Sequence, residues 1–233
     1  MISAHPYAYL VGDALFGVVW LALFFLRKDL WRELLAMSAI GGLLAPFALI
    51  YLPDYWNPDH IIGQFPLGIE DFLFAFFIGG IGSVLYEAMT GKMHTLCECR
   101  RVPRRRIVGI IAAALATAVV FVYGFKMNSI YANYLAFGLL FAYIISYRRD
   151  LFWQSLASGT AVALLMFFFY QVWIALYPGI IGHWWRLENI SGILIAGVPL
   201  EEILWGFSWG MAGGALYEWT RGISSISRVA QSR

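Results

Sequence analysis

Two acidic pairs stand at the head of two long apolar stretches, and they are the residues best suited to do chemistry. They are Glu70-Asp71 and Glu201-Glu202. An ionisable residue within a membrane span costs on the order of 3 kcal/mol, so it usually faces a cavity or a partner. Crowding and burial favour the neutral carboxyl, which can donate a proton, whereas a helix N-terminus favours the carboxylate. The alternative interpretation of Glu201-Glu202, which follow Pro199, is that they are ordinary capping residues at a helix start.

The acidic pairs belong to a longer internal match. Gly68–Gly91 aligns with Pro199–Gly222 without a gap and is identical at nine of 24 positions. The identical pairs are Glu70/Glu201, Leu73/Leu204, Phe76/Phe207, Gly79/Gly210, Gly82/Gly213, Leu85/Leu216, Tyr86/Tyr217, Glu87/Glu218 and Gly91/Gly222. A second echo sets Arg27-Lys28-Asp29-Leu30-Trp31 against Arg148-Arg149-Asp150-Leu151-Phe152. This density of matches indicates an internal duplication.

The composition places these motifs in a membrane protein. The chain of 233 residues is 61% hydrophobic and 13% charged, with a mean hydropathy of +0.71. A soluble domain of this size cannot bury so much apolar surface. The net charge of +2 arises from short basic blocks between apolar runs, which indicates no nucleic-acid partner.

Seven apolar runs are long enough for a bilayer core of roughly 30 Å, which needs about 20 helical residues. They are approximately Tyr7–Leu26, Leu34–Leu52, Pro66–Ala88, Ile107–Phe125, Ile130–Tyr147, Leu151–Tyr177 and Ser191–Thr220. Basic residues crowd the first, third and fifth loops and the tail, so the positive-inside rule predicts an external N-terminus and a cytoplasmic C-terminus. The expected location is the plasma membrane, crossed several times.

The equal polarity of the two acidic motifs requires one extra span between two three-helix units. We therefore predict an all-α fold with seven transmembrane helices in a parallel 3+1+3 internal repeat. Residues 1–91 form the first repeat, residues 92–128 a basic cytoplasmic loop and the linker helix, and residues 129–233 the second repeat and the tail. Glycines at helical spacing in the third and seventh spans predict close helix packing. Gly192, Gly197 and Pro199 predict that the seventh span is unwound before its acids.

Aromatic residues gather in the two loops that precede the acids. Tyr51, Tyr55 and Trp56 lie before the first pair, and Trp173, Tyr177, Trp184 and Trp185 before the second. Belts of Trp and Tyr are common at membrane interfaces. Beside carboxylates, electron-rich rings can also stabilise a cationic intermediate.

These motifs resemble the lycopene cyclase domain, a membrane-integral family whose two copies occur as two small subunits or fused in one chain. The resemblance is carried by Asp54-Tyr55-Trp56…Gly68-Ile69-Glu70-Asp71-Phe72-Leu73-Phe74 and by Trp184-Trp185…Glu188-Asn189…Pro199-Leu200-Glu201-Glu202-Ile203-Leu204-Trp205. It implies catalytic roles for Glu201, Glu202, Glu70 and Asp71. It also implies substrate contacts from Trp56, Tyr55, Trp184, Trp185, Trp205, Phe74 and Asn189. Gly68 replaces the family's proline in the first copy, and Leu73-Phe74 and Leu204-Trp205 replace its usual Phe-Phe.

The resemblance implies a redox-neutral cyclisation of lycopene or a related linear carotene to a β-ring. The reaction class is that of an intramolecular lyase or isomerase, and it needs an acid, a base and a dry cavity but no metal or other cofactor. The substrate would enter from the bilayer. We expect Glu201 or Glu202 to be the proton donor, and a homodimer is left open.

Several alternatives stay open at this point. Another end-group enzyme such as a hydratase uses the same substrates, and small-molecule transporters share the 3+1+3 architecture. A retinal protein needs a Schiff-base lysine, and the seventh span has none. His94 with Cys97-Glu98-Cys99 can form a metal site, though free thiols fit as well. His60 and His183 can relay protons, and Asp13 can face the same cavity. Glu87 and Glu218 suit helix caps or ion pairs near Lys92 and Arg221.

Overall fold

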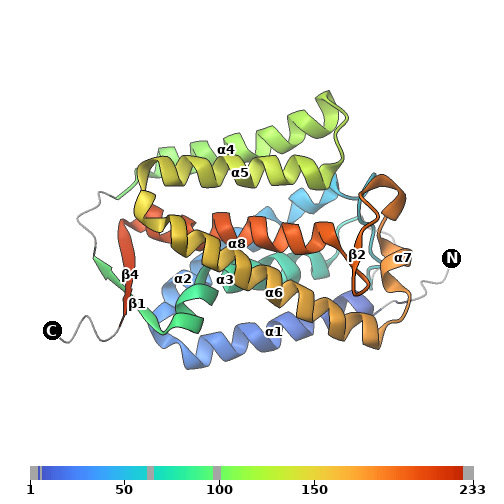
Figure 1. Cartoon of the computed structure of the whole chain (residues 1–233), viewed down its shortest axis with the longest axis horizontal. Helices are drawn as coiled ribbons and strands as arrows, with labels where there is room; N and C mark the ends of the chain where they lie inside the picture. Colours follow the sequence, from blue (N-terminus) through green and yellow to red (C-terminus); the bar gives the residue numbers. More distant parts are fainter. Residues whose placement is uncertain (1–4, 6, 62–65, 97–100, 228–233) are drawn as a thin grey trace.

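The computed structural model describes residues 5, 7–61, 66–96 and 101–227. The fold is mostly helical, and the long helices run along one axis of the molecule (Figure 1). The helices are α1 (Ala8–Leu26), α2 (Trp31–Leu44), α3 (Ile69–Thr90), α4 (Arg104–Val119), α5 (Ser129–Tyr147), α6 (Phe152–Leu176), α7 (Ile180–Trp184) and α8 (Leu200–Arg221). A 3-10 helical segment over Ala45–Ile50 extends α2, and a π-helical segment over Val120–Gly124 extends α4.

Six helical segments of the described chain are long and apolar enough to cross a membrane. They are Ala8–Leu26, Lys28–Ile50, Ile69–Thr90, Arg104–Gly124, Ser129–Tyr147 and Arg149–Leu176, and they confirm the first six predicted spans to within a few residues. The seventh predicted span, Ser191–Thr220, is not among these six, and its helical part begins only at Leu200. α8 has 22 residues, about 33 Å of helix, but its glutamates and many small residues lower its hydropathy. It nonetheless lies alongside the other long helices (Figure 1).

The segment before α8 is unwound, as its glycines and proline predicted. Leu194–Ile195 (β2) and Val198–Pro199 (β3) pair as a two-residue hairpin. Ala196 and Gly197 make its turn with φ of 48° and 85°. A chain at this angle cannot continue a right-handed helix, so α8 starts only after Pro199.

Close packing joins the helices within each half of the chain. A Cβ added at Gly79 of α3 would lie 2.8 Å from the carbonyl oxygen of Met37 in α2. A Cβ added at Gly210 of α8 would lie 2.8 Å from the carbonyl oxygen of Ser158 in α6. Glycine is needed at both places because any side chain would push the backbones apart. The predicted role of these glycines in helix packing is confirmed.

Two short strands were not predicted by the all-α expectation. Lys92–Leu96 (β1) follows α3 and Ile223–Ser227 (β4) follows α8, and the two pair antiparallel with His94 opposite Ser225. Each strand comes directly after a left-handed glycine, Gly91 or Gly222, with φ of 66° and 64°. These glycines end the helices and turn the chain across the end of the bundle, so the two strands meet there (Figure 1).

Arg27 and Arg148 make matching contacts at the same end. Each guanidinium binds an aspartate two residues later, Arg27 to Asp29 at 2.9 Å and Arg148 to Asp150 at 2.8 Å. Each also donates to a carbonyl in the last turn of a helix, Arg27 to that of Glu87 and Arg148 to that of Glu218. A cation at a helix C-terminus donates hydrogen bonds to the free carbonyls and interacts favourably with the negative end of the helix dipole.

The predicted ion pairs of Glu87 and Glu218 were wrong. Both side chains are fully buried. Lys92 donates instead to the hydroxyl of Tyr86, and the guanidinium of Arg221 lies over the ring of Tyr217. The glutamates point inward because they lie on the faces of α3 and α8 that meet in the bundle.

Candidate active site

The two acidic pairs begin α3 and α8 at the end of the bundle opposite β1 and β4. Glu70 and Asp71 lie in the first turn of α3, and Glu201 and Glu202 lie in the first turn of α8. All four side chains are buried. The positive end of each helix dipole makes this a favourable place for carboxylates.

The first acid of each pair holds the loop that precedes it. Glu70 Oε1 accepts the backbone N–H of Ile61 at 2.8 Å, and Glu201 Oε1 accepts that of Ser191 at 2.9 Å. The hydroxyl of Tyr131 also donates to Glu201 Oε1, at 3.0 Å. Neither glutamate lines the cavity described below. These contacts tie each loop to the start of a helix but are not helix caps, since neither N–H belongs to a first helical turn; in α3 the capping contact is made by Asp71, which accepts the N–H of Gly68.

The second acid of each pair faces an apolar cavity of about 210 Å³. Asp71, Glu202 and Asp13 of α1 all line it. More than half of its other lining residues are aromatic, namely Tyr9, Phe47, Tyr51, Tyr55, Trp56, Phe74, Phe137, Phe169, Tyr170, Trp173, Trp185, Trp205 and Trp209. Among the described residues, no lysine or arginine lines it.

Glu202 is surrounded by neutral hydrogen-bond donors. Its Oε1 accepts from the indole Nε1 of Trp185 at 2.8 Å and from the hydroxyl of Tyr55. Its Oε2 accepts from the hydroxyl of Tyr170 at 2.6 Å. Three donors aimed at one carboxyl stabilise its ionised form, which makes Glu202 suited to accept a proton.

Asp71 is held in a second polar arrangement. Its Oδ2 accepts the backbone N–H of Gly68 at 2.7 Å and lies 2.8 Å from Nε2 of His60, while its Oδ1 accepts from the hydroxyl of Tyr9 at 3.1 Å. Burial lowers the pKa of His60, but its hydrogen bond to Asp71 and the nearby negative charges outweigh burial and raise that pKa overall. His60 is therefore favoured as an imidazolium paired with Asp71.

Asp13 has the fewest hydrogen-bond partners of the three cavity acids among the described residues. Its side chain is 1% exposed, and neither carboxyl oxygen has a hydrogen-bond partner among the described residues. A charge buried without a partner costs far more than a neutral carboxyl. Asp13 is thus suited to remain protonated inside the cavity, which it faces as the sequence predicted.

The two aromatic loops before the acids are joined to one another. The backbones of Trp56 and Trp185 form an antiparallel bridge. Next to it, the N–H of Asn57 donates to the carbonyl of Trp184 at 2.9 Å and the N–H of Arg186 to that of Tyr55 at 2.9 Å. This pairing fixes aromatic side chains from both halves of the chain above the same cavity.

Five of the predicted substrate-binding residues line the cavity, namely Tyr55, Trp56, Phe74, Trp185 and Trp205. Two do not. The indole of Trp184 donates to Asp59 at 3.2 Å, and the side-chain amide of Asn189 donates to the carbonyl of Asp54 at 2.9 Å. Both support the loops instead, and the exposed His183 lies 3.3 Å from Asp59 outside the cavity.

Two cavity tyrosines were missed. Tyr9 lies near the start of α1, and Tyr170 lies in the run Phe167-Phe168-Phe169-Tyr170 of α6. A single hydroxyl within an apolar span needs a buried partner, and that was the available signal. The sequence gives no indication that the partners are Asp71 and Glu202.

Comparison with known proteins bears on the second half of the chain. A search of curated proteins and a search of solved structures found no match. A family model described as lycopene cyclase matches residues 128–220, which include α5, α6, α8 and the acids Glu201 and Glu202. This segment of the chain is therefore similar to the lycopene cyclase family.

Proposed function

We propose that the protein cyclises one end group of lycopene or a related linear carotene to a β-ring without any redox change. The observation that carries this proposal is the aromatic cavity faced by three carboxyl groups, Asp13, Asp71 and Glu202. The family of residues 128–220 supports a carotenoid cyclase-like activity, and the cavity supplies acid, base and apolar walls.

The reaction moves one proton in and one proton out. A proton added to the terminal double bond leaves a tertiary cation. The π electrons of an internal double bond attack that cation and close a six-membered ring, which places the positive charge on a ring carbon. Loss of a neighbouring proton forms the ring double bond, so the product has the formula of the substrate. An apolar site prevents water from trapping the cation.

The contacts of the acids suggest their roles. Asp13, which has no partner to stabilise its charge, is the proposed proton donor. Glu202, which accepts three hydrogen bonds, is the proposed acceptor of the proton that leaves the ring. This assignment differs from the sequence-based expectation that Glu201 or Glu202 donates. The faces of the surrounding rings, such as those of Trp56 and Trp205, can stabilise the cation between the two transfers.

The size of the cavity fits one end group. A cavity of about 150 Å³ in another protein holds a benzene molecule, and this one measures about 210 Å³. It has room for one six-membered ring with its methyl groups but not for a C40 chain. The polyene would therefore extend out between the helices toward the bilayer.

Expression in cells that accumulate lycopene tests the proposal. We expect cyclic carotenes with the same mass as lycopene when the pigments are separated and weighed, and none in cells with an empty vector. A product heavier by one water would identify a hydratase instead. Unchanged lycopene, with the protein present in the membrane fraction, would contradict both activities, and uptake into proteoliposomes would then test a transporter.

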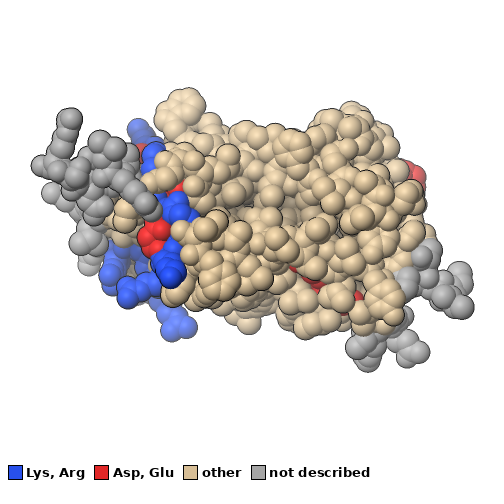
Figure 2. Space-filling view, turned by 90° about the horizontal axis from the view of Figure 1, so that it is seen from below, with Lys and Arg blue, Asp and Glu red and all other residues tan. Residues whose placement is uncertain are grey.

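We also propose that the acidic cavity lies toward the outer face of the membrane. Most exposed basic residues of the described chain belong to the loops and helix ends near β1 and β4, namely Lys28, Arg32, Arg101, Arg104, Arg105, Arg106, Arg149 and Arg221. The exposed Lys126 lies in the loop between α4 and α5 at the other end (Figure 1). Figure 2 shows this basic end, which the positive-inside rule would place in the cytoplasm. A reporter that is active only in the cytoplasm should be active when fused after Arg233. If only a reporter that requires the external side is active there, the orientation of the protein is the opposite of the proposed one.

An internal duplication accounts for several matching contacts. Arg27 and Arg148 bind the last turns of α3 and α8 alike. Glu70 and Glu201 each accept a backbone N–H from the preceding loop. These pairs support a parallel 3+1+3 repeat in which α1–α3 correspond to α5, α6 and α8, with α4 as the linker.

A further inference from the structure

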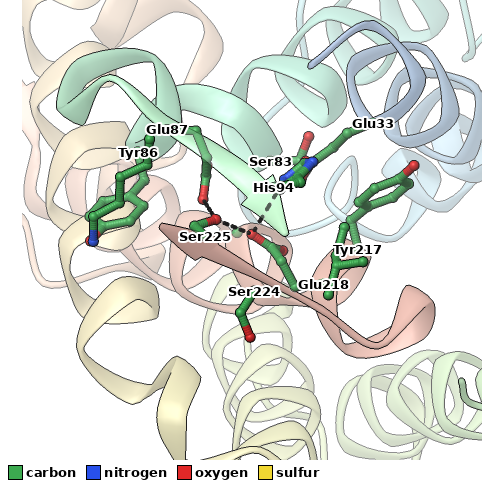
Figure 3. A network of polar contacts seen from close by, with 12 residues as sticks. Glu33, Ser83, Tyr86, Glu87, His94, Tyr217, Glu218, Ser224 and Ser225 are labelled. Carbon is green, nitrogen blue, oxygen red and sulfur yellow. Dashed lines mark hydrogen bonds and ion pairs between the residues drawn. The ribbon is translucent and has the colours of Figure 1, made fainter. Parts of the chain in front are cut away.

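A second buried polar cluster lies at the end of the bundle opposite the cavity (Figure 3). It brings together Glu33 of α2, Glu87 of α3, His94 of β1 and Glu218 of α8. Glu33 is 1% exposed, and Glu87 and Glu218 are 0% exposed. Among the described residues, no lysine or arginine forms an ion pair with these three carboxylates. The proposed cyclisation uses none of them.

Neutral side chains satisfy only part of this cluster. Glu87 Oε1 accepts from the amide of Gln154 at 2.9 Å and from the hydroxyl of Ser225 at 2.7 Å. The same amide also donates to Glu218 Oε1. Oε2 of Glu87 and Oε2 of Glu218 have no hydrogen-bond partner among the described residues. Buried oxygens of this kind are rare without an unseen partner.

Glu33 shows the same deficit more strongly. Nε2 of His94 lies 2.9 Å from its Oε2, and the hydroxyl of Ser83 also lies close to its carboxyl. Among the described residues, neither oxygen of Glu33 accepts a hydrogen bond of good geometry. Nε2 of His94 is also 4.0 Å from Oε1 of Glu218. Figure 3 shows the three side chains converging from α2, β1 and α8. One ligand atom from each lies within 4.8 Å of the other two.

Equivalent positions in the two halves of the chain carry different residues, which explains why the polar cluster contains one such group of ligands and not two. Glu33 follows Arg27 by six residues, and Gln154 follows Arg148 by six. His94 follows Gly91 by three residues, and Ser225 follows Gly222 by three. The first half thus contributes a carboxylate and an imidazole where the second contributes an amide and a hydroxyl. Gln154 and Ser225 donate hydrogen bonds to Glu87, and Gln154 also donates to Glu218. Glu33 and His94 form a group of possible metal ligands together with Glu218.

We propose that Glu33, His94 and Glu218 bind one divalent transition-metal ion, with zinc the best fit. One imidazole and two carboxylates are a ligand set that Zn²⁺ accepts, at bond lengths of roughly 2.0–2.2 Å. Ligand atoms around such an ion are separated by roughly 3–3.5 Å, close to the spacings of 2.9 and 4.0 Å found here. The two positive charges of the ion would also offset the charges of the buried carboxylates, whose burial as unpaired anions is strongly unfavourable.

The ion would connect both halves of the chain. Glu33 and His94 come from the first half and Glu218 from the second, and His94 lies in the strand that pairs with β4. The site would fasten the end of the bundle remote from the cavity. Cys97 and Cys99, the partners weighed for His94 from the sequence, lie outside the described residues.

Metal analysis of the full chain in detergent tests this proposal. After chelation and removal of the chelator, the wild type should take up one Zn²⁺ per chain, with a rise in the temperature of unfolding. Co²⁺ should bind in its place and give visible absorption bands. Glu33→Gln, His94→Gln and Glu218→Gln should each lose the bands and weaken binding by more than about 10- to 100-fold, the loss typical of removing an outer-shell partner.

The controls separate this site from other sources of binding. Glu188→Gln removes an exposed carboxylate at the other end of the bundle and should bind as the wild type does. A double substitution, Cys97→Ser with Cys99→Ser, should also retain the ion. Loss of binding only in the cysteine variant, or equal binding in all variants, would overturn the proposal. So would absence of binding by the wild type, which would leave a cluster of protonated carboxyls. Because Glu218→Gln can impair folding, His94→Gln in β1 provides the second measurement, on protein with unchanged helical circular dichroism.

Discussion

Replacement of Glu202 by glutamine is expected to abolish pigment conversion. Glutamine keeps the shape of the side chain and can still accept hydrogen bonds, but it cannot take up the proton that leaves the ring. General acid–base groups contribute about 10²- to 10⁴-fold to a rate, so conversion should fall at least about 100-fold. Chromatography of pigments from lycopene-accumulating cells measures this loss, with the amount of protein in the membrane as the reference.

Matched variants test whether the loss belongs to the cavity. Glu188→Gln changes an exposed carboxylate at the same end of the molecule and should leave conversion unchanged. Glu201→Gln weakens contacts to Ser191 and Tyr131 and should have a smaller effect. Full conversion by a Glu201→Gln, Glu202→Gln double variant would end the acid–base hypothesis and favour capping roles for both.

Replacement of Asp13 by asparagine is expected to have an effect of similar size. Asparagine has nearly the same volume but no proton to donate to a double bond, so cyclisation should stop before the cation forms. Because Asp13 makes no hydrogen bond among the described residues, the change removes no contact, and the protein should accumulate normally. The same pigment assay, with the thermal stability of the purified protein, separates lost chemistry from lost folding.

The two variants together decide the direction of proton transfer. If Asp13→Asn converts lycopene as the wild type does while Glu202→Gln does not, Asp13 is not the donor. Glu202 would then be the acid, as expected from the sequence alone. Asp71→Asn should reduce conversion less than either of these substitutions. Asp71 is bound by His60 and Tyr9, so its proposed role is to pair with an imidazolium and not to transfer a proton.

The sequence predicts the frame of the site well because hydropathy and helix-start residues act locally. Six spans, the unwound segment before Pro199 and the position of Glu201 and Glu202 in a first helical turn all follow from such local signals. Local signals do not predict which acid of each pair faces the cavity. Neighbouring residues of a helix point about 100° apart, and only the packing of α3 and α8 against the other helices selects Asp71 and Glu202.

Contacts between segments that are distant in the sequence could not be predicted from local sequence patterns. Asp13 precedes Asp71 by 58 residues in the sequence, and no spacing rule joins them in one cavity. The burial of Glu87 and Glu218 was missed for the same reason, because nearby basic residues in the sequence suggested ion pairs. The strands β1 and β4 were missed because each needs the other, more than 120 residues away, to form at all.

The arginines at the ends of α3 and α8 have a mechanical consequence. Each of these helices carries acids bound to a loop at its first turn and a guanidinium bound to its last turn. A helix anchored by opposite charges at both ends resists sliding along its axis, because one turn of displacement would break both sets of contacts. The depth of Asp71 and Glu202 is thereby set by the protein, and the proposed carotene substrate would have to bring its end group to that fixed level.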